Sequence, residues 1–75
     1  MNSDIYDYTI DVMRKKRRDK GISLQTIADC LNVSKTFVAN IENPKNRARL
    51  NFQHVNELSK LFECSPKDFL PTEPL

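Results

Sequence analysis

Glycine, tryptophan, cysteine and histidine are scarce in this chain of 75 residues. It has one glycine, no tryptophan, two cysteines and one histidine. A single glycine allows few tight turns, which argues against a β-meander or barrel and favours helices. Cys30, Cys64 and His54 supply three potential zinc ligands at no recognisable spacing, whereas a structural zinc site needs four. We therefore expect no metal and no cofactor.

Long apolar runs are also absent. No stretch approaches the roughly 20 apolar residues that are needed to cross a bilayer. Asp4, Asp7 and Asp11 interrupt any apolar run that could act as a signal peptide. Two cysteines do not make a disulfide framework. We expect a cytoplasmic protein that has no membrane partner and whose thiols are reduced.

The length allows one domain, which we place at residues 1–75. With 39% hydrophobic and 29% charged residues, the chain is globular rather than disordered. A domain of this size buries only about 60% of its unfolded surface, so a substrate cavity would compete with the core. No Ser-His-acid or Cys-His grouping converges, and one glycine is too few for a phosphate-binding loop. We expect no enzyme activity.

The net charge of +2 is unevenly distributed along the chain. Residues 1–13 carry three acidic side chains and no basic one, and residues 14–49 carry ten Lys or Arg against three acidic side chains. Residues 50–75 carry two basic and four acidic side chains. A basic centre between acidic ends is expected of a chain that faces a polyanion. A solvated charged surface would explain the same pattern.

Apolar residues recur at steps of three and four in five segments, which predicts helices and gives no support to strands. Capping residues precede four of them, and breaks follow at Gly21, Asn32, Asn43-Pro44 and Pro71. The expected helices span about residues 4–19, 24–31, 35–42, 52–62 and 66–70, and residues 71–75 form a loose tail.

Residues 23–43 are the most informative stretch. Two short helices are joined by a turn of three or four residues, and the small Ala28 lets them cross closely. Apolar residues at positions 27, 31, 33, 38 and 41 fill the crossing. This leaves one face of the second helix free, with Lys35, Thr36, Ala39 and Asn40 exposed.

These residues resemble those of a known family. Gly21-Ile22-Ser23, Ile27-Ala28, Leu31-Asn32-Val33-Ser34, Val38 and Ile41-Glu42-Asn43 look like the helix-turn-helix of Cro and lambda-repressor-like (XRE-type) DNA-binding proteins. Residues 58–62 and 64–70 are similar to the family's fourth and fifth helices, so that the resemblance covers about residues 10–70. It implies an all-α fold, a compact five-helix lambda-repressor-like domain.

The resemblance also implies a DNA-binding surface. Helix 35–42 would enter the major groove as the recognition helix, with Lys35, Thr36 and Asn40 at base edges. Phe37 would contact a thymine methyl group or belong to the core. The implied contacts to the DNA backbone come from Gln25, Ser34, Asn43, Lys45, Arg47 and Arg49. Leu24 departs from the family pattern, which usually has Gln there, and Pro44 stands where the family usually has Gly. Lys16 is a further departure, because the family is usually apolar at this position, and we expect its aliphatic part to lie over the core with the amine in water.

The family pairs an arginine of the first helix with a glutamate that ends the third, and Arg17 and Glu42 occupy these positions. Alternatively, Arg17 is one more solvated base in the basic run 14–18. For the run as a whole three interpretations are open: a solvated helix end, a phosphate contact or a nuclear-import-like patch.

We expect Cys30 on the helix face away from the apolar stripe, Cys64 in the core and His54 on the surface.

The function implied is that of a prokaryotic or phage-borne transcriptional regulator, a repressor that binds double-stranded DNA. A homodimer on a two-fold symmetric operator would place two recognition helices about 34 Å apart. Its contact surface would use Ile5, Tyr6 and Tyr8, or Leu70 and Leu75. The alternative is an antitoxin or adaptor of the same fold that binds protein through Phe37 and Ala39. No small-molecule effector site is evident.

Overall fold

Helices account for all the regular structure in residues 4–75, the part of the chain that the computed structural model describes. Four are α-helices: α1 (Ile5–Asp19), α2 (Leu24–Leu31), α3 (Lys35–Glu42) and α4 (Phe52–Phe62). The fifth element, η1 (Pro66–Phe69), is a single 3-10 turn. The expected count of five helices is therefore wrong. Leu70 has extended backbone angles, because Pro71 after it disfavours helical geometry, and the segment stops after four residues.

A polar side chain caps the start of every element. Ser23 and Ser34 accept hydrogen bonds from the backbone N–H groups of Thr26 and Phe37, at 3.1 and 3.0 Å. Asp4 is the extended cap of α1 rather than its first helical residue. Each cap gives a partner to one of the backbone N–H groups that a helix start leaves unpaired. These caps explain why helices as short as α2 and α3 have sharp beginnings.

Three of the helices end in a left-handed residue. Gly21, Asn32 and Glu63 have φ angles of 65°, 57° and 55°. After each of them the next N–H donates back to a carbonyl five residues earlier, as in the 3.0 Å bond from Val33 to Ala28. Glycine and asparagine tolerate this conformation well, whereas glutamate does not, and no sequence signal marked Glu63 as the end of α4.

The core is formed where all five elements meet. Met13 of α1, Ile27 of α2, Val38 of α3, Leu58 of α4 and Phe69 of η1 are all fully buried. Their burial removes apolar surface from water and supplies the main stabilisation of the fold. Because this one cluster draws on every element, displacing any one of them would disturb the positions of the others.

The core begins beyond the first turn of α1. Ile10 is buried while Ile5 is exposed, so the first turn of α1 extends beyond the core. The Lys16 amine lies 6.0 Å from the centre of the Phe69 ring. This contact agrees with the expectation that the aliphatic part of Lys16 lies over the core.

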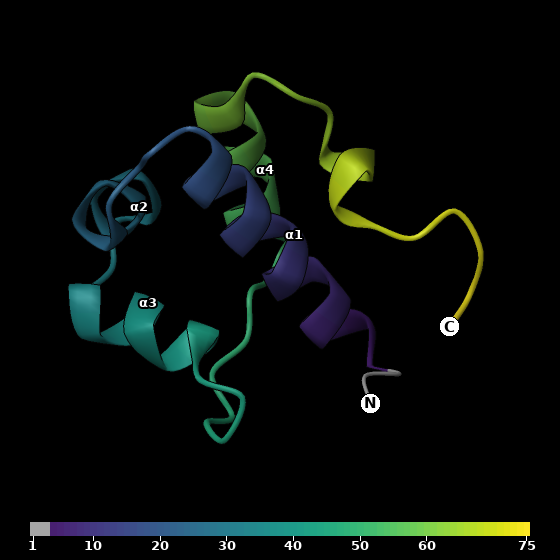
Figure 1. Cartoon of the computed structure of the whole chain (residues 1–75), viewed down its shortest axis with the longest axis horizontal. Coiled ribbons are helices and arrows are strands. Elements are labelled where there is room, and N and C mark those ends of the chain that lie inside the picture. Colours follow the sequence, from purple (N-terminus) through teal and green to yellow (C-terminus); the bar gives the residue numbers. More distant parts are fainter. Residues whose placement is uncertain (1–3) are drawn as a thin grey trace.

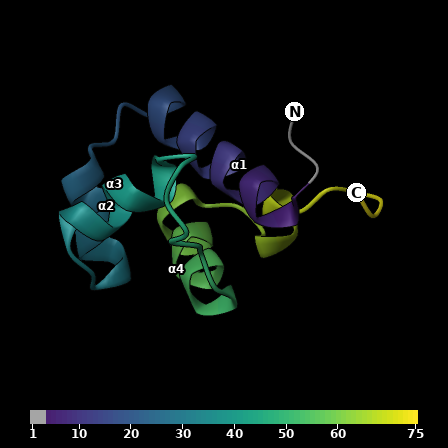
Figure 2. The same cartoon turned by 90° about the horizontal axis from the view of Figure 1, so that it is seen from below.

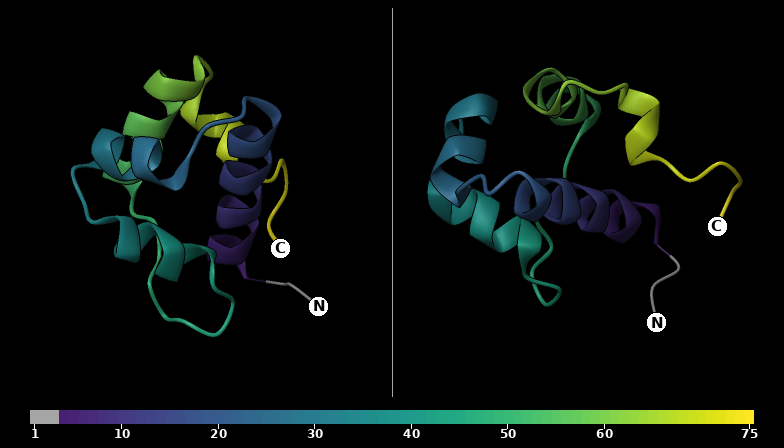
Figure 3. Two further views of the ribbon diagram at one scale, coloured as in Figure 1. Left: turned by 60° about the vertical axis from the view of Figure 1, so that its left-hand side comes forward. Right: turned by 45° about the horizontal axis from the view of Figure 1, so that its top comes forward.

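The elements divide the molecule into two ends. In Figure 1, α2 and α3 lie together on the left, whereas η1 and both termini lie on the right, beyond α1. Figure 2 shows α4 on the side of α1 that faces away from the viewer in Figure 1. α3 contacts α2 and α1, and α4 contacts α2 and η1. The domain measures 31 × 28 × 22 Å, and α3 lies at its surface in every view (Figure 3).

Candidate nucleic-acid interface

A three-residue turn, Asn32 to Ser34, joins α2 to α3. Asn32 adopts the left-handed conformation, and Ser34 caps α3 directly afterwards. Ala28, which has no exposed surface, lies in α2 where this helix packs against α3. A larger side chain at this position would separate the two helices. The short turn and the small residue together produce the helix-turn-helix geometry.

The outer side of α3 is free of core contacts. Val38 and Ile41 are buried, while Lys35, Thr36 and Ala39 are exposed and Asn40 is half-buried. The three side chains that the sequence analysis placed at base edges are thus not enclosed by the protein. Phe37 is intermediate between the buried and the exposed residues of α3, since it is half-buried and packs against the core cluster.

The three uncharged residues implied as backbone contacts have local hydrogen bonds. Ser34 Oγ accepts the N–H of Phe37 as the cap of α3, and Asn43 Oδ1 accepts the N–H of Lys45 at 3.0 Å. Gln25 Nε2 donates to Asp29 Oδ1 at 2.9 Å, one turn further along α2. All three residues are exposed. Gln25 therefore lies along its own helix, with its amide next to a carboxylate.

The loop that follows α3 contains the remaining basic candidates. Lys45 and Arg47 are exposed, whereas Arg49 is half-buried. Arg49 Nη1 donates to the carbonyls of Asn46 and Ala48, at 2.9 and 3.0 Å. Asn46 Oδ1 accepts the N–H of Ala48 and tightens the same turn. Arg49 thus holds the shape of the loop, which is a role that the sequence analysis did not assign to it.

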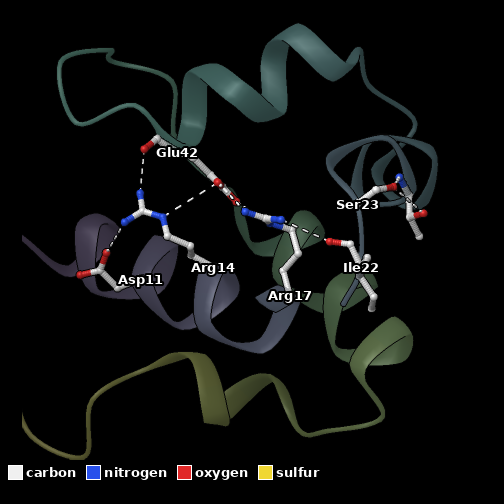
Figure 4. Close-up of polar contacts among 7 residues, drawn as sticks. Asp11, Arg14, Arg17, Ile22, Ser23 and Glu42 are labelled. Atoms are coloured by element: carbon white, nitrogen blue, oxygen red, sulfur yellow. Dashed lines mark hydrogen bonds and ion pairs between the residues drawn. The ribbon is translucent and has the colours of Figure 1, made fainter. Parts of the chain in front are cut away.

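Arg17 and Glu42 lie together as an ion pair. Arg17 Nε and Nη2 donate to the two carboxylate oxygens of Glu42, at 2.9 and 3.0 Å (Figure 4). The two side chains are only 16% and 13% exposed. Arg17 Nη1 also donates to the carbonyl of Ile22 at 3.2 Å. One guanidinium therefore connects α1, the turn before α2 and the last residue of α3.

Arg14 is a second arginine that holds the end of α3, and no sequence signal distinguished it from its basic neighbours. Its Nη2 donates to the backbone carbonyl of Glu42 at 2.7 Å, and its Nε lies 3.9 Å from the Glu42 carboxylate (Figure 4). A cation at the last carbonyl of a helix also favours the helix dipole. The run 14–18 is therefore not simply a solvated helix end, because two of its five bases hold α3.

His54 and Cys30 lie in places that differ from those expected. His54 is half-buried: Nδ1 accepts the N–H of Asn51 at 3.1 Å, and its ring packs edge-on against Phe37, with 5.9 Å between centroids. Burial lowers the pKa of the His54 imidazole. His54 therefore lies at the surface only in part, because its ring packs against Phe37 of α3. No local sequence signal could have shown this contact.

Cys30 faces α4 rather than solvent. Its thiol donates to the Glu57 carbonyl at 3.5 Å, and the residue packs against the core cluster. Burial raises the pKa of the Cys30 thiol, the Glu57 carboxylate raises it further, and Lys60 opposes this shift. The expectation that Cys30 points away from the apolar stripe is wrong, because α4 covers that side of α2. Cys64 is half-buried against the same core.

The described residues show neither a metal-ligand cluster nor a helix suited to a membrane. No three His, Cys, Asp or Glu side chains in residues 4–75 lie close enough together to hold a metal ion. Within the same range, every helix is too short or too polar to cross a bilayer.

A comparison with models of protein families identifies this arrangement of helices. Residues 12–74 match a family model described as a Cro/C1-type helix-turn-helix DNA-binding domain. Neither the curated proteins nor the solved structures include a significant match to the chain. The matched range contains α2, α3, α4 and η1 entirely, together with the second half of α1.

Proposed function

The chain belongs to the Cro/C1-type helix-turn-helix DNA-binding family, and from this premise we propose that it recognises a specific duplex sequence through α3 and represses transcription there. The observation that carries the proposal is the free outer side of α3, where three hydrogen-bonding side chains lie next to one another. A helix of this kind fits the width of the major groove, the groove in which every base pair differs from the others.

Each of the three side chains has chemistry suited to a base edge. Lys35 can donate to guanine O6 or N7, and Asn40 can form two hydrogen bonds with adenine. Thr36 can donate a hydrogen bond or place its methyl group against that of thymine. Asn40 is half-buried, so part of its surface stays available for such a contact.

Contacts to the phosphates would come from both sides of α3. Lys45 and Arg47 extend from the following loop, and Arg49 lies behind them with its guanidinium against the loop carbonyls. Ser34 and Asn43 lie at the two ends of α3, while Gln25 lies in the first turn of α2. These contacts would position the domain without reading the sequence.

Salt dependence tests the electrostatic part of the proposal. Three basic loop residues per subunit would neutralise about six phosphates in a dimer, so log affinity should fall against log salt with a slope of about −5. Fluorescence anisotropy of a labelled duplex at several salt concentrations measures this slope. A slope near zero would reject the proposed phosphate contacts.

Base preference tests the role of α3. Replacing Asn40 or Lys35 by alanine should each cost about 1–3 kcal/mol at one base pair and relax the preference there. Arg47→Ala is the matched control, because loss of a phosphate contact should weaken binding to all duplexes alike. Selection from a random duplex library with each variant measures both effects. An unchanged preference for Asn40→Ala would remove Asn40 from the base-reading set.

The protein-binding alternative makes a different prediction. An antitoxin or adaptor that uses Phe37 and Ala39 would not need the exposed bases at positions 35, 45 and 47. Phe37 is already half-buried, and its ring packs edge-on against that of His54. Retention of the chain on random duplex DNA at low salt favours the DNA-binding role, and failure to bind under these conditions favours the alternative.

A further inference from the structure

A polar cavity lies between α1 and the segment that follows α3. It has a volume of about 330 Å³, and its walls are the first part of α1, the last residues of α3 and the loop after them. These elements lie beside one another in Figures 1 and 3. Asp7, Ile10, Asp11 and Arg14 share one face of α1 there, since steps of three and four residues connect them. The cavity thus reaches from α1 to the loop that carries the proposed phosphate contacts.

Most of the charged groups that line the cavity already have partners. Arg14 Nη1 donates to Asp11 Oδ1 at 3.5 Å, and its Nη2 donates to the Glu42 carbonyl at 2.7 Å (Figure 4). The Glu42 carboxylate is paired with Arg17, which does not line the cavity. These four residues therefore balance one another and leave no charge for a ligand to neutralise.

Two charges of opposite sign remain, one on α1 and one on the loop. Asp7 is half-buried, and within residues 4–75 its carboxylate has neither a hydrogen bond nor an ion pair. Arg49 is also half-buried and uses Nη1 for two loop carbonyls, so that its Nε and Nη2 can still donate. A partly buried charge without a partner loses hydration and gains nothing in return. The buried Ile10 and Ile41 form an apolar part of the same cavity.

We propose that this cavity binds a small zwitterion, an α-amino acid with an aliphatic side chain. Its ammonium group would donate to Asp7, its carboxylate would accept from Arg49, and its side chain would lie against the two isoleucines. A net anion or a net cation would leave one of the two protein charges unpaired, whereas a zwitterion satisfies both. The volume is that of about eleven water molecules, which is room for an amino acid of the size of leucine.

Occupation of the cavity would weaken DNA binding, a consequence that rests on the proposed function. Arg49 is one of the bases proposed to contact phosphates, and a bound carboxylate would neutralise its charge. We therefore expect the amino acid to lower the affinity for duplex DNA. The slope of log affinity against log salt should become less steep by about 0.9 for each Arg49 that is withdrawn from a phosphate.

NMR of the isotope-labelled chain without DNA tests the site, with leucine, valine and methionine as probes. At least one of them should bind with a Kd below about 1 mM and shift the backbone amides around Asp7 and Arg49 more than those of α4. The N-acetyl form of that amino acid lacks the ammonium group and the amide form lacks the carboxylate, so each should bind at least tenfold more weakly. No binding of any probe at about 10 mM, or equal binding of the N-acetyl form, would overturn the proposal.

A substitution at Asp7 tests the same contact from the side of the protein. Asp7→Asn removes the charge that would hold the ammonium group and should weaken binding at least tenfold. Asp19→Asn is the matched control, because Asp19 is an exposed acid of the same helix outside the cavity, and this variant should bind like the wild type. Circular dichroism should show that both variants are folded. Equal binding by the wild type and by Asp7→Asn would reject the site.

Fluorescence anisotropy of a labelled duplex, with and without the amino acid, tests the effect on DNA binding. The amino acid should lower the affinity of the wild type and leave that of Asp7→Asn unchanged. An unchanged wild-type affinity would overturn the placement of the carboxylate on Arg49. A chain that binds the amino acid but no duplex would contradict the proposed function and support the site, so that the two failures are distinguishable.

Discussion

The two ends of α3 are held by different kinds of interaction. Its last residue, Glu42, is gripped by Arg14 and Arg17 through hydrogen bonds that span 28 and 25 residues of sequence. Its first turn is held by the Ser34 cap and by the Phe37 ring, which packs edge-on against His54. The polar end therefore depends on the direction of a few hydrogen bonds, whereas the aromatic end depends on filled space.

This difference has consequences for the proposed role of α3 in the major groove. Two guanidiniums on one residue fix both the position and the rotation of the end of α3, because their hydrogen bonds are directional. The packing of Phe37 allows small shifts at the start, where Lys35 and Thr36 lie. We therefore expect substitutions at the polar end to affect stability most, and pH to act at the aromatic end.

The largest effect is expected for Arg17→Met. Methionine keeps much of the apolar stem but leaves the nearly buried Glu42 carboxylate with only the more distant Arg14, at 3.9 Å. Breaking such a pair should lower the free energy of unfolding by about 3 kcal/mol, as measured by urea denaturation. The double variant Arg17→Met, Glu42→Gln should recover part of this loss, because no charge is left unpaired. A loss below about 1 kcal/mol for the single variant would show that the pair contributes little.

Arg14→Met should have a smaller effect on the same end. It removes the hydrogen bond to the Glu42 carbonyl and should lower the free energy of unfolding by about 1–2 kcal/mol. Arg18→Met is the matched control from the same basic run: Arg18 is exposed, and its replacement should change stability by less than about 0.5 kcal/mol. Equal losses for the two variants would mean that Arg14 acts only through the general charge of α1.

The sequence predicted the bounds of α3 far better than the contacts that hold its two ends. Ser34, the Asn43-Pro44 break and the apolar spacing define where α3 begins and ends, because caps and periodicity are local properties. The Arg17 and Glu42 pair followed from the family resemblance. Arg14 could not be distinguished from its basic neighbours, because its partner lies 28 residues away and only the packing of α1 against α3 brings them together.

The same reasoning explains the other errors. The contact between Phe37 and His54 depends on how α4 crosses α3, and the burial of Cys30 depends on how α4 covers α2. Neither arrangement leaves a periodic signal in one segment. The length of η1 was overestimated because a good capping serine indicates where a helix starts but not whether it continues.

The smallest effect, and the one that tests the aromatic end, is a dependence of stability on pH. Because burial lowers the pKa of His54, the folded chain binds fewer protons than the unfolded chain just below the usual histidine pKa of about 6.5. Stability should therefore fall as the pH decreases below about 6.5, and protonated Nδ1 can no longer accept the Asn51 N–H. The loss in the free energy of unfolding should not exceed about 1 kcal/mol, the value of one helix cap.

The variant His54→Gln isolates the histidine, because it keeps an acceptor at this position without a titrating group. The measurement is the difference in the free energy of unfolding between wild type and variant, from urea denaturation at pH values from 7.5 to 5. If the two proteins lose stability in parallel, the acids of the chain cause the dependence and the His54 contact does not.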